Sequence, residues 1–272
     1  YNEQEVLLSL LNNKYYENQR IFMHLNFKGN SNIMELIEKK ENQMTFKAKV
    51  DESIANAIRR YVNQIPVLAI DEVEIFKNDS PLYDETIAHR IGLIPLKMDS
   101  TMDEKTTVNL KLVSKKTGAV LSKELSGKVK VVYDNIPITI LGEGQELEIV
   151  GHAKMGKGVE HSKFSPGLIF YRNISEVIMD KEFLSEVKKI CPQADVKERG
   201  DKIIVIDNKK ESFCDVCEGI CKEKGKNAET KLTNELMITI DSFGQMEVKD
   251  IFKKSLSALK KDFNELGKKI DK

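Results

Sequence analysis

A strand followed by a helix is predicted near each end of this chain, and this pairing constrains the fold more than any other feature. Residues 43–50 alternate strictly between polar and apolar side chains, which predicts a strand with one buried side. Asp51 then offers an N-cap, and apolar residues recur at helical spacing until Pro66 ends the segment. Near the other end, residues 232–240 favour a strand and a helical pattern follows Gly244. We therefore expect the two ends to fold together, with the middle of the chain inserted between them.

The helical pattern at the C-terminal end has heptad spacing. From Phe252 onward the steps between apolar residues run four, three, four, three, four. Lysine and acidic residues occupy most other positions. This spacing fits a helix packed on its own domain, and it equally fits a helix whose seam meets a partner helix. The seam consists of Phe252, Leu256, Leu259, Phe263, Leu266 and Ile270.

The middle of the chain reads as short strands separated by turns. Strands are predicted at residues 69–76, 108–113, 129–133, 138–141 and 147–150. Asp134-Asn135 and Gly142-Glu143-Gly144 mark turns between them. A helix over 182–190 and a strand over 202–206 follow. This pattern predicts an antiparallel β-rich domain and then a smaller α+β segment.

Composition and charge argue against a protein that holds nucleic acid over its whole surface and against a membrane protein. Basic and acidic residues both number 43, so the chain lacks the basic excess of proteins that hold nucleic acid over their whole surface. No apolar run approaches the roughly 20 residues that cross a bilayer. The run at residues 6–11 follows Glu3 and Glu5, where a signal peptide would be positively charged. We expect a soluble cytoplasmic protein without a membrane partner, and we treat residues 1–30, which start at Tyr1, as an N-terminal extension.

Two stretches carry a family resemblance. Residues 55–97 contain Asn56-Ala57-Ile58-Arg59-Arg60, Ala69-Ile70-Asp71, Asp84-Glu85 and the segment Ala-His-Arg-Ile-Gly-Leu-Ile-Pro-Leu at 88–96. Residues 156–166 read Gly-Lys-Gly-Val-Glu-His-Ser-Lys-Phe-Ser-Pro. The first stretch resembles the RNA polymerase family that contains the bacterial α chain, its archaeal counterparts and the third-largest chain of eukaryotic polymerase II. The second resembles the archaeal and eukaryotic members rather than α.

The resemblance covers about residues 31–272 and implies an α+β fold in several parts. It implies a discontinuous α-like dimerisation domain over 31–65 and 230–272, an inserted antiparallel β-rich domain over 66–172, and a small ferredoxin-like insert over 173–229. The implied function is non-catalytic assembly of DNA-dependent RNA polymerase. The chain would pair with the small subunit L, helices against helices, and form a platform for subunits N and P and the large catalytic subunits. It would contact DNA only through the complex, and the magnesium-binding carboxylates would belong to another subunit.

We expect the charged residues of these stretches to make surface or structural contacts rather than to act in catalysis. Arg59 and Arg60 lie away from the apolar positions of their helix, so they can pair with a partner or remain a solvated face. Glu85 and His89 share a helix face, and we expect a structural polar contact rather than acid–base chemistry there.

All four cysteines lie between residues 191 and 221, which indicates metal ligation rather than structural disulfides. Cys214, Cys217 and Cys221 align with the last three cysteines of the bacterial ferredoxin pattern, with Glu211 in place of the first. Cys191 precedes a proline, as the last cysteine of the companion motif does, although the other three positions of that motif hold Lys181, Leu184 and Val187. The segment resembles a two-cluster ferredoxin domain that has lost one cluster. The expected ligands are Cys191, Cys214 and Cys217, with Cys221 as a fourth, for a 4Fe–4S or 3Fe–4S iron–sulfur cluster; zinc, or cysteines without metal, are the alternatives.

Two other functional classes, a P-loop-like nucleotide-binding protein and a ferredoxin-like redox protein, have weaker support in the sequence. Residues 151–158 nearly match a phosphate-binding P-loop, but Gly158 stands where the loop needs Ser or Thr, and Pro166 disfavours a long following helix. A stand-alone ferredoxin-like redox protein is disfavoured because the cysteine pattern is confined to residues 173–229 of 272.

Overall fold

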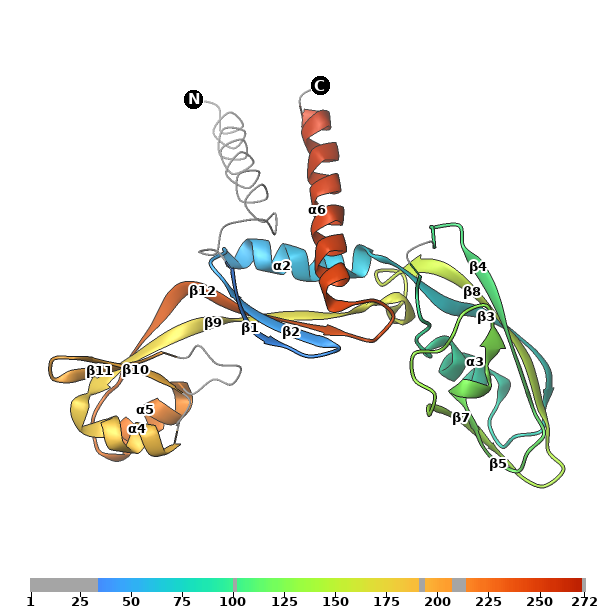
Figure 1. Ribbon diagram of the computed structural model, residues 1–272, viewed down its shortest axis with the longest axis horizontal. Helices are drawn as coiled ribbons and strands as arrows, with labels where there is room; N and C mark the ends of the chain where they lie inside the picture. Colours follow the sequence, from blue (N-terminus) through green and yellow to red (C-terminus); the bar gives the residue numbers. More distant parts are fainter. Residues whose placement is uncertain (1–33, 100–101, 191–193, 207–213, 271–272) are drawn as a thin grey trace.

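The computed structural model describes residues 34–99, 102–190, 194–206 and 214–270. The molecule is elongated, and a central unit of sheet and helices lies between two lobes (Figure 1). The expected N-terminal extension, residues 1–30, lies outside the described residues. Within those residues, no helix is long and apolar enough to cross a membrane.

The central unit joins the two ends of the chain in one sheet. Strand β2 (Gln43–Ala48) pairs antiparallel with β12 (Glu229–Ser242), so segments about 190 residues apart in sequence are direct neighbours. The full sheet has six strands, with all neighbours antiparallel. The expectation that the two ends fold together is confirmed. The strand order is β1 (Met34–Lys39), β2, β12, β9 (Gly167–Asp180), β11 (Lys202–Ile206) and β10 (Asp195–Arg199).

Helices α2 (Glu52–Tyr61) and α6 (Val248–Ile270) cover one face of this sheet (Figure 1). Asp51 caps α2 as predicted, because its carboxylate accepts a hydrogen bond from the Ser53 amide at 2.8 Å. A short 3-10 helix, η1 (Val62–Gln64), ends the segment, and Pro66 begins the next strand. The apolar faces of the helices pack on the sheet, and the rings of Phe46 and Phe252 meet edge to face at 5.3 Å.

The opposite face of β2 was expected to be exposed, but Thr45 is fully buried. Its hydroxyl is hydrogen-bonded to that of Thr239 on β12 at 3.1 Å. The long side chains on either side are also paired across the strands, with the Gln43 amide donating to Asp241 at 2.6 Å and Lys47 lying 3.0 Å from Glu235. A row of polar cross-strand pairs therefore replaces the solvated face that simple alternation predicts.

The first lobe is antiparallel and β-rich, as expected. A four-stranded sheet has the order β3 (Pro66–Asn78), β8 (Leu147–Lys157), β4 (Thr107–Ser114) and β6 (Ser126–Gly127). Strands β5 (Gly118–Leu121) and β7 (Pro137–Leu141) form a separate pair, the one-turn helix η2 (Ser122–Glu124) follows β5, and helix α3 (Asp84–Gly92) packs against β3 and β7. The predicted strand at 129–133 is wrong. Val129 and Val131 are buried, but Val131 forms only one isolated bridge, to Leu96, because the irregular chain around Pro95 is too short to build a ladder.

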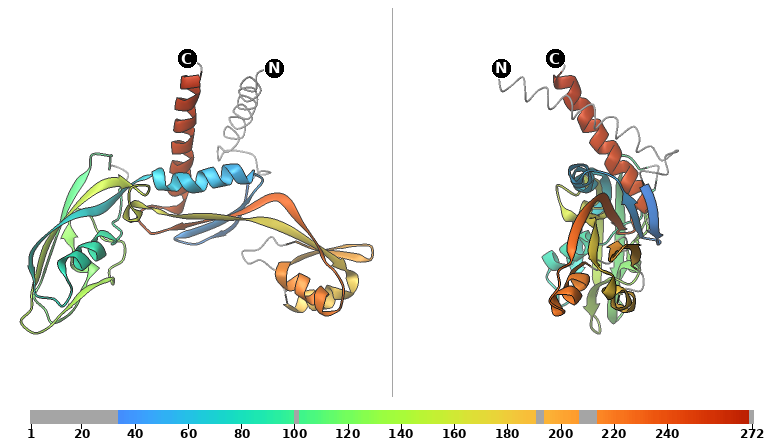
Figure 2. Two further views of the ribbon diagram at one scale, coloured as in Figure 1. Left: turned by 180° about the vertical axis from the view of Figure 1, so that it is seen from behind. Right: turned by 90° about the vertical axis from the view of Figure 1, so that its left-hand side faces the viewer.

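The second lobe continues the central sheet. Strands β9 and β12, each 14 residues long, run out of the central unit into this lobe, with a register shift between Leu232 and Leu236. Strands β11 and β10 complete the sheet there. Helices α4 (Leu184–Ile190) and α5 (Cys214–Glu223) cover its core, and the 3-10 helix η4 (Lys181–Phe183) leads into α4. The views in Figure 2 show both helices on the same side of these strands.

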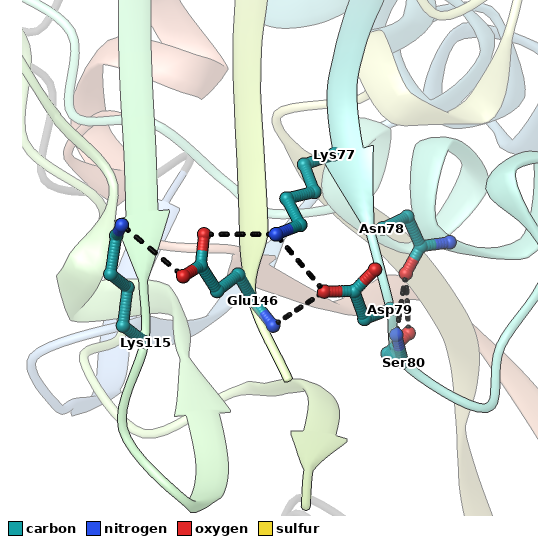
Figure 3. A network of polar contacts seen from close by, with 6 residues as sticks. All are labelled: Lys77, Asn78, Asp79, Ser80, Lys115 and Glu146. Carbon is teal, nitrogen blue, oxygen red and sulfur yellow. Dashed lines mark hydrogen bonds and ion pairs between the residues drawn. The ribbon is translucent and has the colours of Figure 1, made fainter. Parts of the chain in front are cut away.

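A polar network closes the far end of the β-rich lobe (Figure 3). The Glu146 carboxylate lies 3.2 Å from Lys77 and 3.3 Å from Lys115, and Asp79 accepts a hydrogen bond from the Glu146 amide at 3.1 Å. Hydrogen bonds from Lys77 and then Lys115 hold the pKa of Glu146 below its ordinary value. These groups are exposed, so the network orders turns between strands and adds little to global stability.

Candidate subunit-docking face, domain junction and cysteine segment

Helix α6 uses its apolar seam in two ways. Phe252 and Leu259, each only 2% exposed, pack into the core of the central unit. Leu256 and Phe263 are half-buried against the same core. Leu266 is 52% exposed, and the C-terminal part of the helix projects away from the sheet (Figures 1 and 2). The interpretation that the helix packs on its own domain holds for its first turns. The interpretation that its seam meets a partner helix stays a prediction, and Leu266 in the last turns is an exposed apolar residue available for it.

The end of α2 lies beside this helix. The Tyr61 hydroxyl donates a hydrogen bond to the Asp262 carboxylate on α6 at 2.9 Å. Burial and this hydrogen bond raise the pKa of Tyr61. Arg59 and Arg60, in the preceding turn, are both exposed, and Arg59 bonds within its own helix to the Asn56 side chain at 2.9 Å. The prediction that these arginines serve a partner stays a prediction. We call the exposed surface of α2 and α6 around this crossing the docking face.

Asp71 lies beside the joint, the region of η1, the start of β3 and residues 156–166 where the β-rich lobe meets the central unit, and its own ion pairs stay within the lobe. Asp71 on β3 lies 2.5 Å from Lys154 on β8 and 2.5 Å from Lys163, which follows β8. Hydrogen bonds from Lys154 and then Lys163 hold the pKa of Asp71 below its ordinary value. The lysine side chain at 163 is only 13% exposed, so this pair is better shielded than the network at the lobe tip.

The second signature stretch completes the joint. Phe164, in the short helix η3 (Ser162–Phe164), is buried against Val67 and Ala69 of β3. A Cβ atom on Gly156 would lie 2.7 Å from the Phe164 ring. The next part of the stretch binds η1: the hydroxyl of Ser165 donates to the Asn63 side chain at 3.0 Å. The glycines of this stretch therefore permit close packing of the chain on both sides of the joint.

This geometry excludes the P-loop interpretation. Residues 151–157 lie inside β8, where they pair with β3 and β4, and do not form a loop. The helix that follows directly, η3, has three residues and offers no N-terminus for a phosphate. Backbone amides already used in two strand ladders cannot cradle a ligand. In α3, both Glu85 and His89 are exposed, and the predicted polar contact of the His89 side chain is not formed with any other described residue.

The cysteine segment is described only in part. Cys191 lies outside the described residues, and Cys214 begins α5 with its side chain outside them. Cys217 and Cys221 lie on the same face of α5 and are fully buried among apolar side chains of the second lobe. Burial raises the pKa of the Cys221 thiol, with the nearby acidic side chains headed by Asp180 adding to the effect. A cysteine binds a metal as its thiolate, and the ligand roles expected for the four cysteines stay predictions.

Comparison with known proteins gives the family. The family model described as the RNA polymerase Rpb3/RpoA insert domain matches residues 73–169. DNA-directed RNA polymerase subunit Rpo3 of Pyrococcus furiosus is 34% identical over 243 residues, covering 83% of this chain and 92% of the relative. The subunit of the same name from Thermococcus kodakarensis is 32% identical over 256 residues, covering 87% and 98%. That of Archaeoglobus fulgidus is 29% identical over 260 residues, covering 88% and 97%. The chain belongs to the Rpo3 family of DNA-directed RNA polymerase subunits.

Membership of the Rpo3 family confirms the resemblance seen in the sequence. The matched insert domain runs from within β3 to the start of β9, so it covers most of the β-rich lobe and the second signature stretch, and it begins just after Asp71. Sequence reasoning missed Asn63, whose side chain and carbonyl hold the returning chain through Ser165 and the Val159 amide. The available signal was the pair of glycines, Gly156 and Gly158, at the end of a strand pattern, because glycine in a strand often marks a close approach of another backbone.

Proposed function

We propose that this Rpo3-family chain is a non-catalytic assembly subunit of DNA-directed RNA polymerase that pairs with the small subunit L through its docking face. The observation that carries the pairing is the end of α6, where Leu266 is exposed although Phe252 and Leu259 of the same seam are packed in the core. Burial of such a stripe against a second helix is the usual reason for heptad spacing. The two lobes, on either side of the central unit, are then the surfaces for subunits N and P and the large catalytic subunits.

The proposal assigns the chemistry of RNA synthesis to other subunits. Nucleotidyl transfer needs carboxylates that hold magnesium. Among the residues that the structure describes, no group of three or more His, Cys, Asp or Glu side chains can hold a metal ion. The test is extension of a primed template by the purified isolated chain and by the polymerase assembled with it. Synthesis by the assembled enzyme alone supports the proposal, whereas synthesis by the isolated chain refutes it.

The same proposal includes a cofactor. Cys191, Cys214 and Cys217, with Cys221 as a fourth ligand, would hold an iron–sulfur cluster of the 4Fe–4S or 3Fe–4S type, tying the end of α4 to the start of α5. When bound, such a cluster links two segments more than 20 residues apart and adds to the stability of the lobe. A visible absorption spectrum with iron and sulfide analysis of anaerobically purified protein tests it. Zinc in place of iron, or protein without metal, contradicts the cluster and leaves the assembly role intact.

A further inference from the structure

Helix α6 is strongly basic in a chain that is neutral overall. It has seven lysines and only three acidic residues, Asp250, Asp262 and Glu265. The whole chain has 43 basic and 43 acidic residues, so the other elements are acidic on balance. The positive charge is thus concentrated on the helix that carries the uncovered apolar side. The lysines are Lys249, Lys253, Lys254, Lys260, Lys261, Lys268 and Lys269.

Several lysines of the sheets are paired with acidic neighbours. Lys47 lies 3.0 Å from Glu235, and Lys111 lies 2.8 Å from Glu148. No lysine of α6 forms an ion pair with another residue in the described part of the chain. Asp262 lies on the same helix as these lysines, but its carboxylate accepts a hydrogen bond from Tyr61 on α2 rather than pairing with one of them. Within the described residues, the positive charge of α6 is therefore not compensated by ion pairs.

The lysines also have a definite position relative to the seam. Lys249, Lys253 and Lys260 follow one another at intervals of four and seven residues, which places them in one row along the helix. They are all exposed. Asp262 lies on the other side of the seam, towards α2. The apolar stripe of α6 therefore has a row of lysines beside it, and Arg59 and Arg60 are exposed near the crossing of the two helices. A surface of this kind is complementary in charge to a partner helix whose apolar stripe is flanked by acidic residues.

We infer that the docking face selects an acidic partner: a helix of another subunit whose apolar stripe is flanked by Asp and Glu. This inference rests on the proposed function and adds the chemistry of the partner surface. A protein fits better than nucleic acid, because Leu266 and Phe263 lie within the same stripe and phosphates offer nothing to bury them. Residues 1–33 fit less well, since they contain three acidic and three basic residues and have no net charge to match.

Salt dependence and charge reversal of the full chain test the inference. Binding to subunit L is measured at about 0.1 M salt, where the Debye length is about 10 Å, and at about 1 M, where it is about 3 Å. The triple variant Lys249→Glu, Lys253→Glu, Lys260→Glu should weaken binding about 10- to 100-fold at the lower salt and much less at the higher. Lys and Glu have similar helix propensity, so the helix should persist, and thermal melting checks this. The matched control reverses three exposed lysines of the β-rich lobe, Lys105, Lys116 and Lys128, and should change binding less than twofold.

Each outcome has a distinct meaning. Equal binding by the triple variant and the control, at both salt concentrations, overturns the acidic-partner inference. If Leu266→Asp still abolishes binding in that case, the proposed pairing with L stands and only the inference falls. If neither change weakens binding, both fall. A labelled DNA duplex that displaces L from the original chain, and that binds the control but not the triple variant, identifies the face as a nucleic-acid site and overturns the inference.

Discussion

Replacing Leu266 by Asp should separate partner binding from folding. Leu266 is 52% exposed near the projecting end of α6, so its side chain contributes little to the core of the isolated chain. Surface substitutions of this kind usually change the free energy of unfolding by less than about 0.5 kcal/mol. Leu259, one heptad earlier, is 2% exposed and packed in the core. The same substitution there should act on folding first.

The magnitudes follow from the exposed fractions. Full burial of a leucine side chain is worth about 1.5–3 kcal/mol, so the half that Leu266 still exposes can contribute about 1 kcal/mol to binding. Placing a carboxylate in the interface costs about 2 kcal/mol or more in addition. The sum of about 3 kcal/mol corresponds to at least about 100-fold weaker binding. At Leu259, the loss of a buried side chain alone costs about 2–5 kcal/mol, a large part of a typical total of about 5–15 kcal/mol.

The assay needs two measurements on each variant. Urea unfolding of the isolated chain gives its stability, and titration with subunit L gives the dissociation constant. We expect Leu266→Asp to unfold at nearly the same urea concentration as the original chain and to bind L at least about 100-fold more weakly. Leu259→Asp should lower the unfolding midpoint strongly, and its binding should fall only because less folded chain is present.

Two results would refute this reasoning. Unchanged affinity of Leu266→Asp for L means that the projecting end of α6 is not in the interface. A large loss of stability in the isolated Leu266→Asp chain means that this end packs within the chain, and the distinction between the two leucines then fails.

Three further predictions follow from the joint and the second lobe. Asp71→Asn should lower the free energy of unfolding by about 1–2 kcal/mol above about pH 4. Because the folded-state pKa of Asp71 is depressed, the difference in stability between the original chain and the variant should shrink as pH falls through that pKa. Urea titrations at several pH values measure this difference. Gly156→Ala should cost about 1–3 kcal/mol because its methyl group would lie 2.7 Å from an aromatic ring, whereas Gly219→Ala, with open space at its Cβ, should not lower the melting temperature. If a cluster is bound, changing Cys191 and Cys214 together to Ser should speed proteolysis of the second lobe while pairing with L survives; lost pairing with unchanged proteolysis would contradict this.

The sequence predicted the central unit well because its elements have clear periods. The change from alternation to helical spacing after residue 50 gave β2, α2 and the cap at Asp51, and the same change near Gly244 gave β12 and α6. Burial on one face produces such periods directly. Where an element packs through one face only, the spacing of its apolar residues is enough to predict its type and its approximate bounds.

The sequence could not predict features that depend on what lies opposite an element. Thr45 reads as a surface residue until β12 brings Thr239 beside it. Residues 129–133 have the side-chain pattern of a strand, but their neighbour around Pro95 cannot form a ladder. Residues 151–157 contain the glycines and lysines of a phosphate loop, yet pairing with strands on both sides uses their backbone. In each case the tertiary neighbour, and not the local pattern, decided the outcome.

The heptad of α6 shows the same limit at the site itself. Packing within a domain and packing against a partner both need apolar residues at this spacing, so Leu259 and Leu266 are equivalent in the sequence. They differ because α6 leaves the sheet after its first turns and its C-terminal part projects away from it, as the views in Figure 2 show. The charge pattern of α6 separates these two kinds of packing, which its apolar pattern does not. A helix whose seam is entirely internal has no need to concentrate seven lysines that form no ion pair with the other described residues, so this charge argues for a second surface that meets the helix.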